Sequence, residues 1–245
     1  MISKSRLTTR ISTLIFIILF LAQLNYAQEV VEDDISFILN VKAGPIFQST
    51  PFELPGFNNS LTSGNANSFG ALAQADLIIQ KGWIGLITTF YGRFAGADES
   101  FYTNTYNLSK FSSHSFYSRG VMTGLYIEKK FVNSMIQALY CKYQWGGFNA
   151  GYPSQDLTFK ESSIDKIAID PAICSGFVSS SGLGIKLNGG TKLTILVDLN
   201  FIFENGNFNL KELTQYIDDI PSNYNQSVVW QHYVYNLNVG LSYKL

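Results

Sequence analysis

Few side chains in this sequence have the chemistry of a catalytic acid, base or nucleophile. The histidines are His114, inside a serine-rich segment, and His232, near the end of the chain. Ser113 precedes His114, and a serine hydroxyl beside an imidazole can be activated as a nucleophile. A hydrolase also needs an orienting carboxylate that converges on this pair, and no hydrolase motif accompanies it. The sequence therefore predicts that the protein is not an enzyme.

Patterns for binding metals or phosphates are equally sparse. Asp218 and Asp219, with Glu212 nearby, lack the alternating oxygen donors of a calcium loop. Cys141 and Cys174 have no metal-ligand spacing and are too few for a disulfide framework. No glycine-rich phosphate motif connects a strand to a helix. We expect no metal, no cofactor and two unpaired thiols.

The first residues have the order of a secretory signal peptide. Three basic residues precede an apolar run at residues 14–21, and cleavage is expected after Ala27. The run is short for a membrane-spanning helix, which needs about 20 apolar residues. We therefore assign residues 1–27 to a signal peptide for export through the Sec pathway and residues 28–245 to one mature domain.

The mature domain is weakly acidic and rich in aromatic residues. Removing residues 1–27 takes away three cations and no acid, so the 17 Lys and Arg fall to 14 against 18 Asp and Glu, and the net charge is −4. This balance gives no basic footprint for a nucleic acid. Charged residues make up 14% of the chain, whereas soluble proteins have about 25%. The composition indicates that water is not the only solvent of this protein.

The dominant pattern in the mature domain is alternation with the period of two that is typical of strands. Odd positions from Tyr233 to Leu245 are all apolar or aromatic, whereas Val234 is the one hydrophobic residue at the even positions from His232 to Lys244. No mature segment reaches 18 consecutive apolar residues, so we expect no helical span. The alternation predicts eight strands, near residues 35–47, 68–80, 83–95, 115–129, 135–149, 172–188, 191–204 and 227–245.

The connections between these strands alternate in length. Short turns are expected at Lys81-Gly82, at 130–133 and at Gly189-Gly190. The other connections are rich in Asn, Ser, Gly, Asp and Pro, and they span 49–67, 96–114, 150–171 and 205–226. This order predicts an all-β fold: a closed, antiparallel, up-and-down barrel with both ends of the chain at the short turns.

Glycine decides which face of the barrel is inside. The interior of an eight-stranded barrel is narrow, so residues without a side chain suit its concave face. Gly92 and Gly147 are exceptions, but most strand glycines share the polar register: Gly44, Gly70, Gly85, Gly120, Gly124, Gly146, Gly176, Gly182, Gly184 and Gly240. We therefore expect the polar face to line the lumen and the apolar face to contact lipid. A lipocalin-like barrel would have the opposite arrangement.

Charged and aromatic residues agree with this orientation. Aromatic side chains are concentrated near both ends of the predicted strands, as is typical at the two interfaces of a membrane with water. Charged side chains in the polar register can neutralise one another inside the barrel, as buried charges must. The predicted lumen network consists of Lys42, Asp76, Arg93, Glu128, Lys142, Lys186, Lys192, Asp198 and Glu204.

The last eight residues, NVGLSYKL, resemble the assembly signal of the small outer-membrane β-barrel proteins of Gram-negative bacteria. Asn238, Gly240, Tyr243 and Leu245 occupy its polar, glycine and apolar positions, although the family usually ends in Phe or Trp. The resemblance implies that the barrel-assembly machinery binds this strand by edge pairing. It also implies a location in the outer membrane, with lipid as a partner.

We expect the long loops to carry the activity, because a filled lumen leaves them as the accessible part. This predicts surface recognition of an unidentified extracellular or envelope partner, or an envelope-structural role. The alternatives are an outer-membrane lipid-modifying enzyme that depends on His114 and a secreted lipocalin-like ligand carrier. Candidate contact residues are Phe52, Phe57, Phe101, Tyr102, Tyr106, Tyr152, Tyr216, Asp218 and Tyr224.

Overall fold

Long antiparallel strands form most of the computed structural model, which describes residues 34–51, 65–96, 99–105, 107–131, 135–160, 165–188 and 192–245. Residues 35–245 are one unit. Its eight principal strands are β1 (Ile35–Pro51), β2 (Asn65–Lys81), β3 (Ile84–Ala95), β5 (Phe116–Lys130), β6 (Ile136–Tyr152), β9 (Ala172–Asn188), β10 (Leu193–Ile217) and β11 (Ile220–Lys244).

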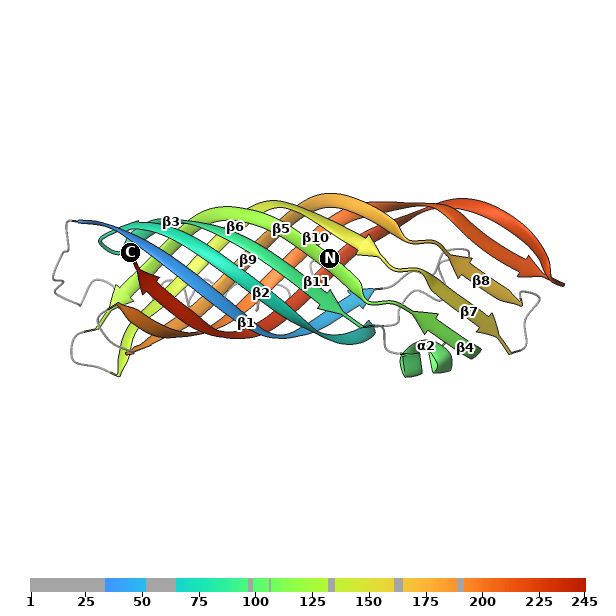
Figure 1. Cartoon of the computed structure of the whole chain (residues 1–245), viewed down its shortest axis with the longest axis horizontal. Helices are drawn as coiled ribbons and strands as arrows, with labels where there is room; N and C mark the ends of the chain where they lie inside the picture. The colour runs from blue at the N-terminus through green and yellow to red at the C-terminus, as the bar shows by residue number, and fades with distance from the viewer. Residues whose placement is uncertain are drawn as a thin grey trace, which may run out of the picture. The chain divides into compact units, whose positions relative to one another are not determined.

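These eight strands close into a barrel. Each strand pairs antiparallel with the next in chain order, and β11 returns to pair with β1 from Ile38↔Lys244 to Ser49↔Tyr233. The strands cross the view of Figure 1 obliquely, as strands of a closed barrel do. The structure thus confirms the predicted closed, antiparallel, up-and-down barrel.

A smaller set of elements extends the barrel at one end. These are α2 (Glu99–Thr105), β4 (Leu108–Ser113), β7 (Gln155–Phe159) and β8 (Lys166–Ile169). Strand β8 pairs with the end of β10, β7 pairs with β8, and β4 pairs with β7. We call β4, β7, β8 and the β10–β11 hairpin beyond the Leu213↔Tyr224 pair the distal sheet. It lies at the opposite end from the C-terminus (Figure 1).

The segment 205–226 is a hairpin, and the prediction of a long irregular loop there was wrong. Strands β10 and β11 pair up to Ile217↔Ile220, with an irregularity between Leu210 and Leu213. Asp218 and Asp219 form the turn, with φ of 48° and 60°. Two positive φ values suit the twist of paired strands in a two-residue hairpin. The predicted loops 96–114 and 150–171 likewise contain strands β4, β7 and β8.

Turns at the other end are short where the structure describes them. Gly82 and Trp83 connect β2 to β3, one residue beyond the predicted position. Gly82 has a φ of 61°, a conformation that glycine adopts without steric cost. The predicted turn at Gly189-Gly190, part of the turn at 130–133 and the predicted signal peptide lie outside the described residues.

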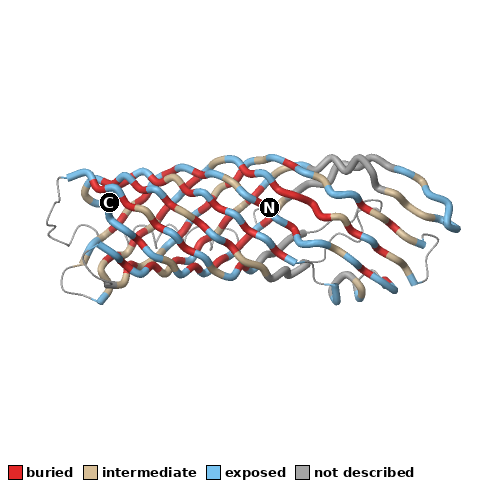
Figure 2. The backbone as a smooth tube through the Cα atoms, in the orientation of Figure 1, coloured by how far each residue is buried: buried red, intermediate tan, exposed pale blue. Residues whose placement is uncertain are grey.

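Where side chains are described, burial alternates along the barrel strands, and the lumen charges are among the buried residues. Asp198 and Asn238 are buried, whereas their neighbours Leu199 and Leu237 are 63% and 42% exposed on the outer wall. The alternation is visible along the strands of Figure 2. At Gly44, a Cβ would overlap the backbone carbonyl of Leu237, so this inward position accepts only glycine.

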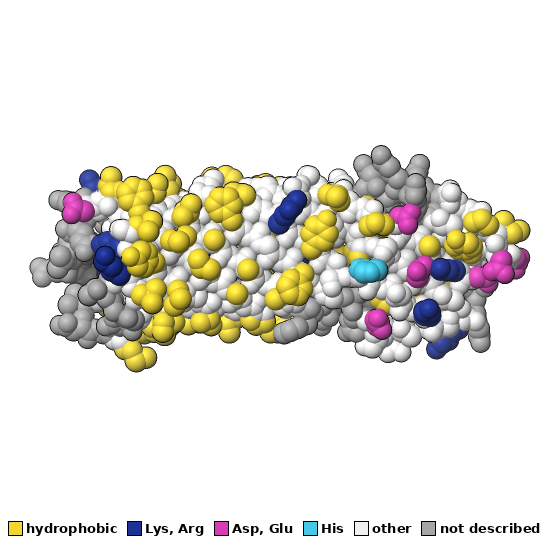
Figure 3. Space-filling model, viewed as in Figure 1, with side chains coloured by type: hydrophobic (Ala, Val, Ile, Leu, Met, Phe, Trp, Pro, Cys, Tyr) yellow, Lys and Arg dark blue, Asp and Glu magenta, His cyan; other side chains and the backbone are white. Residues whose placement is uncertain are grey.

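The outer wall is apolar over the length that a membrane requires. On β10, outward residues from Leu193 to Phe203 are hydrophobic, and the outward residues beyond are Asn205 and Asn207. A transmembrane strand needs about 9–11 residues. In Figure 3, hydrophobic side chains spread over the barrel, and charged ones are concentrated toward its two ends. The fold is therefore a transmembrane barrel of the outer-membrane type.

No helix among the described residues is long and apolar enough to cross a membrane.

Candidate functional site

The lumen next to the short turns is filled by a lower layer built on β5 and β9. The Lys186 Nζ lies 2.5 Å from the Glu128 carboxylate, which also accepts a hydrogen bond from the Tyr126 hydroxyl. The Lys186 ammonium lies 5.6 Å from the centre of the Tyr126 ring. Apolar side chains surround this layer, among them Ile38, Ile78, Ile87 and Leu196.

A middle layer holds two lysines and two aspartates. Lys42 on β1 forms ion pairs with Asp76, at 2.8 Å, and with Asp198. Lys142 lies 3.9 Å from both aspartates. Tyr140 donates a hydrogen bond of 3.0 Å to Asp198. Four strands thus contribute to one buried charge cluster.

Amides from neighbouring strands complete the middle layer. Asn238 donates to Asp198 at 3.0 Å and to Gln74 at 3.1 Å. Asn200 also donates to Asp198, at 2.8 Å. These bonds matter because a buried carboxylate needs hydrogen bonds as well as a cation to remain ionised at tolerable cost.

An upper layer lies toward the barrel mouth, on β3, β5, β10 and β11. The guanidinium of Arg93 forms an ion pair with Glu204 through Nη2, and its Nε donates to the other carboxylate oxygen at 3.2 Å. Ser118 and Tyr91 donate to that second oxygen at 2.6 and 2.8 Å. His232 Nδ1 lies 3.1 Å from Arg93 Nη2. His232 is therefore part of a buried hydrogen-bond network.

The lumen charges balance within each layer. Among the described residues, Lys42, Lys142, Arg93 and Lys186 pair with Asp76, Asp198, Glu204 and Glu128. Lys192 does not belong to this network: it is exposed and precedes the first residue of β10, so its placement in the lumen was wrong. Without it the network has four cations and four anions, which removes the excess charge of the predicted set.

An apolar core fills the mouth above these layers. It joins side chains from the barrel interior, including Ile46, Phe116, Phe148 and Val234, to side chains from the distal sheet. The sheet contributes Leu108, Phe111, Leu157, Ile167 and Ile169, all buried. We call this cluster the mouth core. It places buried apolar side chains between the ion-paired layers of the lumen and the distal sheet.

The outer face of the distal sheet is polar. Lys166 on β8 lies 2.8 Å from Asp156 on β7, and both side chains are partly exposed. The hydrogen bond from Lys166 to Asp156 raises the pKa of Lys166. The Lys166 ammonium also lies 5.9 Å from the centre of the Tyr216 ring. In the distal sheet, apolar side chains therefore face inward and charged ones face water.

The serine-rich segment near the mouth does not bring Ser113 to the imidazole of His114. The Ser113 hydroxyl donates to the backbone carbonyl of His114. The imidazole Nδ1 instead lies 3.1 Å from the hydroxyl of Ser154. The two histidines lie in different environments, because His114 is exposed and His232 is buried.

The structure distributes the predicted contact residues over several environments. Tyr152 is 2% exposed, stacks edge-on against Phe116 and donates to Gln155, so it belongs to the mouth core and not to a contact surface. Asp218 is exposed at the hairpin turn, and Tyr216 is half-buried nearby. Phe52, Phe57 and Tyr106, and the side chains of Phe101, Tyr102 and Tyr224, lie outside what the structure describes.

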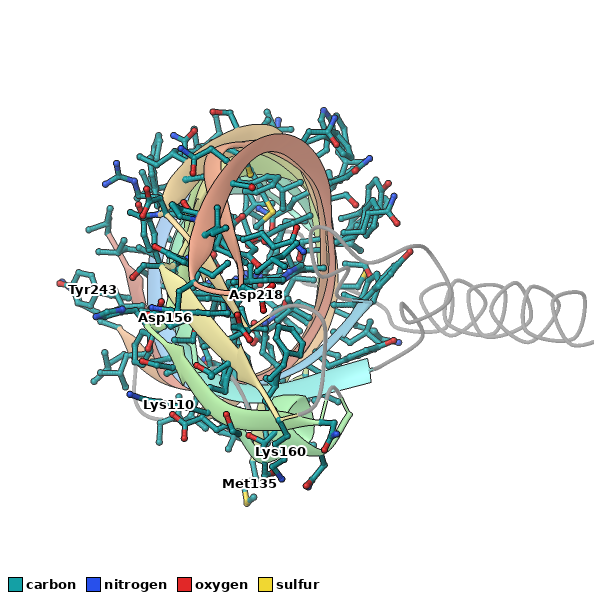
Figure 4. The ribbon with its side chains drawn as sticks, turned by 90° about the vertical axis from the view of Figure 1, so that its right-hand side faces the viewer. Lys110, Met135, Asp156, Lys160, Asp218 and Tyr243 are labelled. Atoms are coloured by element: carbon teal, nitrogen blue, oxygen red, sulfur yellow. The ribbon has the colours of Figure 1, made fainter. Side chains whose placement is uncertain are left out.

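The tip of the β10–β11 hairpin carries exposed apolar residues that are not among the residues predicted from the sequence. Ile217 is 40% exposed and Ile220 is 67% exposed, one on each side of the Asp218-Asp219 turn. In Figure 1 this hairpin is the farthest part of the barrel unit from the C-terminus, and in the end-on view of Figure 4 Asp218 projects over the mouth. The sequence signal that could have indicated an exposed apolar tip is the pair of isoleucines on either side of two aspartates.

The C-terminal strand is held on both sides. Strand β11 pairs with β1 and β10, and Leu245 N donates to the carbonyl of Phe37 at 2.9 Å. Asn238 is buried in the lumen, whereas Tyr243 and Leu245 are exposed on the outer wall. In Figure 4, Tyr243 lies at the periphery of the barrel. Cys141 and Cys174 are free thiols in opposite registers.

No protein-family model and no curated protein matches the chain. Solved structures with similar architecture include Neisserial surface protein A, at 10% identity and a TM-score of 0.45, with 86% of this chain and 99% of that chain covered. A major outer membrane protein from Thermus thermophilus shows 14% identity and a TM-score of 0.44, covering 86% and 100%. The attachment invasion locus protein Ail of Yersinia pestis shows 12% identity and a TM-score of 0.40, covering 85% and 98%.

Proposed function

We propose that this protein is an outer-membrane barrel that holds a folded, non-conducting platform at the bacterial surface for recognition of an envelope or extracellular partner. The mouth core carries this proposal. Its buried residues connect the barrel interior to the distal sheet, so side-chain packing holds the sheet to the barrel in addition to the chain connections. A recognition surface benefits from such rigidity, because less conformational entropy is lost on binding.

The lumen argues against a transport role. Eight-stranded barrels leave an interior just wide enough for side chains. Here that space holds ion-paired layers, and the mouth core lies above them. We expect no general diffusion of solutes through this barrel.

The hairpin tip is the best contact surface among the described residues. Ile217 and Ile220 expose apolar area at the distal end, and Asp218 and Asp219 place two carboxylates between them. Exposed apolar side chains bordered by charges are typical of protein interaction sites. We propose a protein partner with an apolar contact region and a basic rim.

The route to this location follows from the two ends of the chain. Residues 1–27 would direct export through the Sec pathway and be removed after Ala27. Asn238, Gly240, Tyr243 and Leu245 would then be read by the barrel-assembly machinery before β11 closes on β1. The lipocalin-like alternative loses support, because it requires an apolar interior, and the buried lumen charges are inconsistent with that.

Membrane fractionation with electrophoresis before and after boiling tests the location. A folded transmembrane barrel should resist carbonate extraction and change its gel mobility only after boiling. Release of the protein by carbonate, with the same mobility in both lanes, would contradict the proposal.

Binding to whole cells or envelope fractions tests the recognition surface. The double variant Ile217→Ser, Ile220→Ser should weaken binding, and Leu199→Ser on the lipid-facing wall is the matched control for an exposed aliphatic residue. His114→Ala and Ser154→Ala should leave binding unchanged. A change in membrane-lipid masses that depends on His114 would instead favour the lipid-modifying enzyme.

A further inference from the structure

The outer wall of the barrel has a groove near the margin of its apolar band. The groove has a volume of about 570 Å³ and crosses β3, β5, β6 and β9. Phe90 and Val121 form part of its apolar lining, and Gly147 leaves the wall open between them and β9. Because Gly147 faces outward, its missing side chain hollows the surface that contacts lipid.

A row of polar side chains borders the same groove. Arg119, Asn149 and Ser175 are exposed and lie opposite one another on adjacent strands, as the pairs Arg119↔Asn149 and Asn149↔Ser175. Elsewhere the outward positions of these strands are mostly apolar. A cation on a lipid-facing wall is costly near the bilayer centre, and that cost falls at the interface.

The groove presents hydrogen-bond donors and no carboxylate. The Ser175 hydroxyl donates to Asn149 Oδ1 at 2.6 Å, and the Nδ2 group of Asn149 adds two donor hydrogens. Arg119 adds a guanidinium with five donors. No acidic side chain lines the groove or pairs with Arg119 within the described ranges. Such a set of groups is complementary to an anion.

We place this row at the headgroup level of the membrane from its neighbours on β5. Tyr117 on the distal side of Arg119 and Val121 on the other side are both exposed. Aromatic and basic side chains together are typical of the membrane–water interface. A phosphorylated lipid combines an anionic headgroup with an apolar chain and therefore fits both the polar row and the apolar lining of the groove.

We infer that this groove binds a phosphorylated lipid of the distal leaflet. Arg119 and the Asn149 amide hold the phosphate, and the space beside Gly147, Phe90 and Val121 accommodates an acyl chain. Guanidinium groups bind phosphate oxygens through paired, charge-assisted hydrogen bonds. This inference rests on the proposed membrane location.

Native mass spectrometry of the folded barrel in dodecyl maltoside tests the inference. The protein is incubated with phosphatidic acid or with diacylglycerol that has the same acyl chains, and the retained lipid is counted. We expect preferential retention of phosphatidic acid. Arg119→Gln should lower that preference about tenfold, the size expected for loss of one charge-assisted contact worth about 1.4 kcal/mol.

Two further variants separate the phosphate contact from the acyl-chain contact. Gly147→Leu should reduce retention of both lipids, because a Cβ at Gly147 meets only a backbone oxygen at 3.8 Å, so the larger side chain extends into the groove without disturbing the barrel. Lys81→Gln removes an exposed outward cation at the opposite end of the barrel and should change nothing. Heat-modifiable mobility confirms that each variant is folded.

The outcomes distinguish the inference from the proposed location. Equal retention of phosphatidic acid by the native protein and by folded Arg119→Gln would contradict the phosphate site in the groove, but it would not contradict the membrane barrel. Displacement of phosphatidic acid by inorganic phosphate would show a free-anion site and overturn the lipid assignment. A protein without heat-modifiable mobility would overturn both proposals.

Discussion

The barrel and the distal sheet use the same strand alternation with opposite polarity. In the barrel, Asp198 is buried and Leu199 faces outward. In the distal sheet, Leu157 is buried and Asp156 faces outward. The backbone is continuous between the two regions through β10 and β11. The surrounding solvent, lipid in one region and water in the other, therefore determines which face of a strand is apolar.

The largest expected effect comes from breaking the buried charge network. Asp198→Ala should lower the free energy of unfolding by about 3–5 kcal/mol, because Lys42 and Lys142 lose one of the two carboxylates that they share. Urea denaturation in detergent, followed by heat-modifiable mobility, measures the change. Asp156→Ala removes the same group from an exposed pair and should cost under about 1 kcal/mol. If the two variants lose the same free energy of unfolding, then burial does not make the lumen ion pairs more important for stability than the exposed pair.

The mouth core should weaken without loss of the barrel. Leu157→Ala removes a fully buried side chain, and such truncations cost about 2–5 kcal/mol. We expect faster proteolytic cleavage within the distal sheet, while heat-modifiable mobility persists. If the barrel and the sheet unfold together, then the two regions are one cooperative unit.

A cation on the outer wall sharpens the contrast between lipid and water. Leu199→Arg places a charge near the middle of the apolar band and should cost about 2–4 kcal/mol in folding into lipid vesicles. Asn207→Arg, outside the band on the same strand, should cost about 0–1 kcal/mol. Denaturation from vesicles of one composition gives both values. A similar cost at both positions would place the membrane boundary elsewhere.

The smallest effect is a pH dependence confined to the distal sheet. The pKa of Lys166 is raised above 10.5 by its hydrogen bond to Asp156, so the contribution of this pair is complete below pH 10.5 and is lost as the pH rises through the raised value. We expect proteolysis of the sheet to accelerate only in this alkaline range. In Asp156→Ala the pH dependence of proteolysis should be weaker. If the dependence is unchanged in this variant, then other titrating groups cause it.

Much of the barrel follows from alternation, because each strand must satisfy one apolar and one polar environment. Strand β9 matches the predicted 172–188, and the inward glycines lie where neighbouring backbone or lumen side chains leave no room for a Cβ. The two outward exceptions, Gly92 and Gly147, have open space around them. The lumen position of Lys142 could be predicted for the same reason, since its register is inward.

The distal sheet could not be predicted in the same way. Strands β7 and β8 have five and four residues, too few for a period of two to stand out among polar neighbours. The turn at Asp218-Asp219 lacks the usual glycine of a hairpin, so the sequence does not distinguish it from the rest of the long connection at 205–226. Lys192 has the inward register of β10 but lies one residue before the strand begins, so the alternation misplaced it. The burial of Tyr152 depends on contacts between distant segments in the mouth core, which the local pattern does not reveal.

The two strands of the β10–β11 hairpin have 25 residues each, so they reach about 85 Å at the usual rise per residue. Strand β11 also forms the seam where the barrel closes on β1. A force applied at the tip therefore runs along the strands and loads the seam in shear, with many backbone hydrogen bonds resisting at once. The hairpin tip is therefore mechanically coupled to the membrane-embedded wall through two continuous strands.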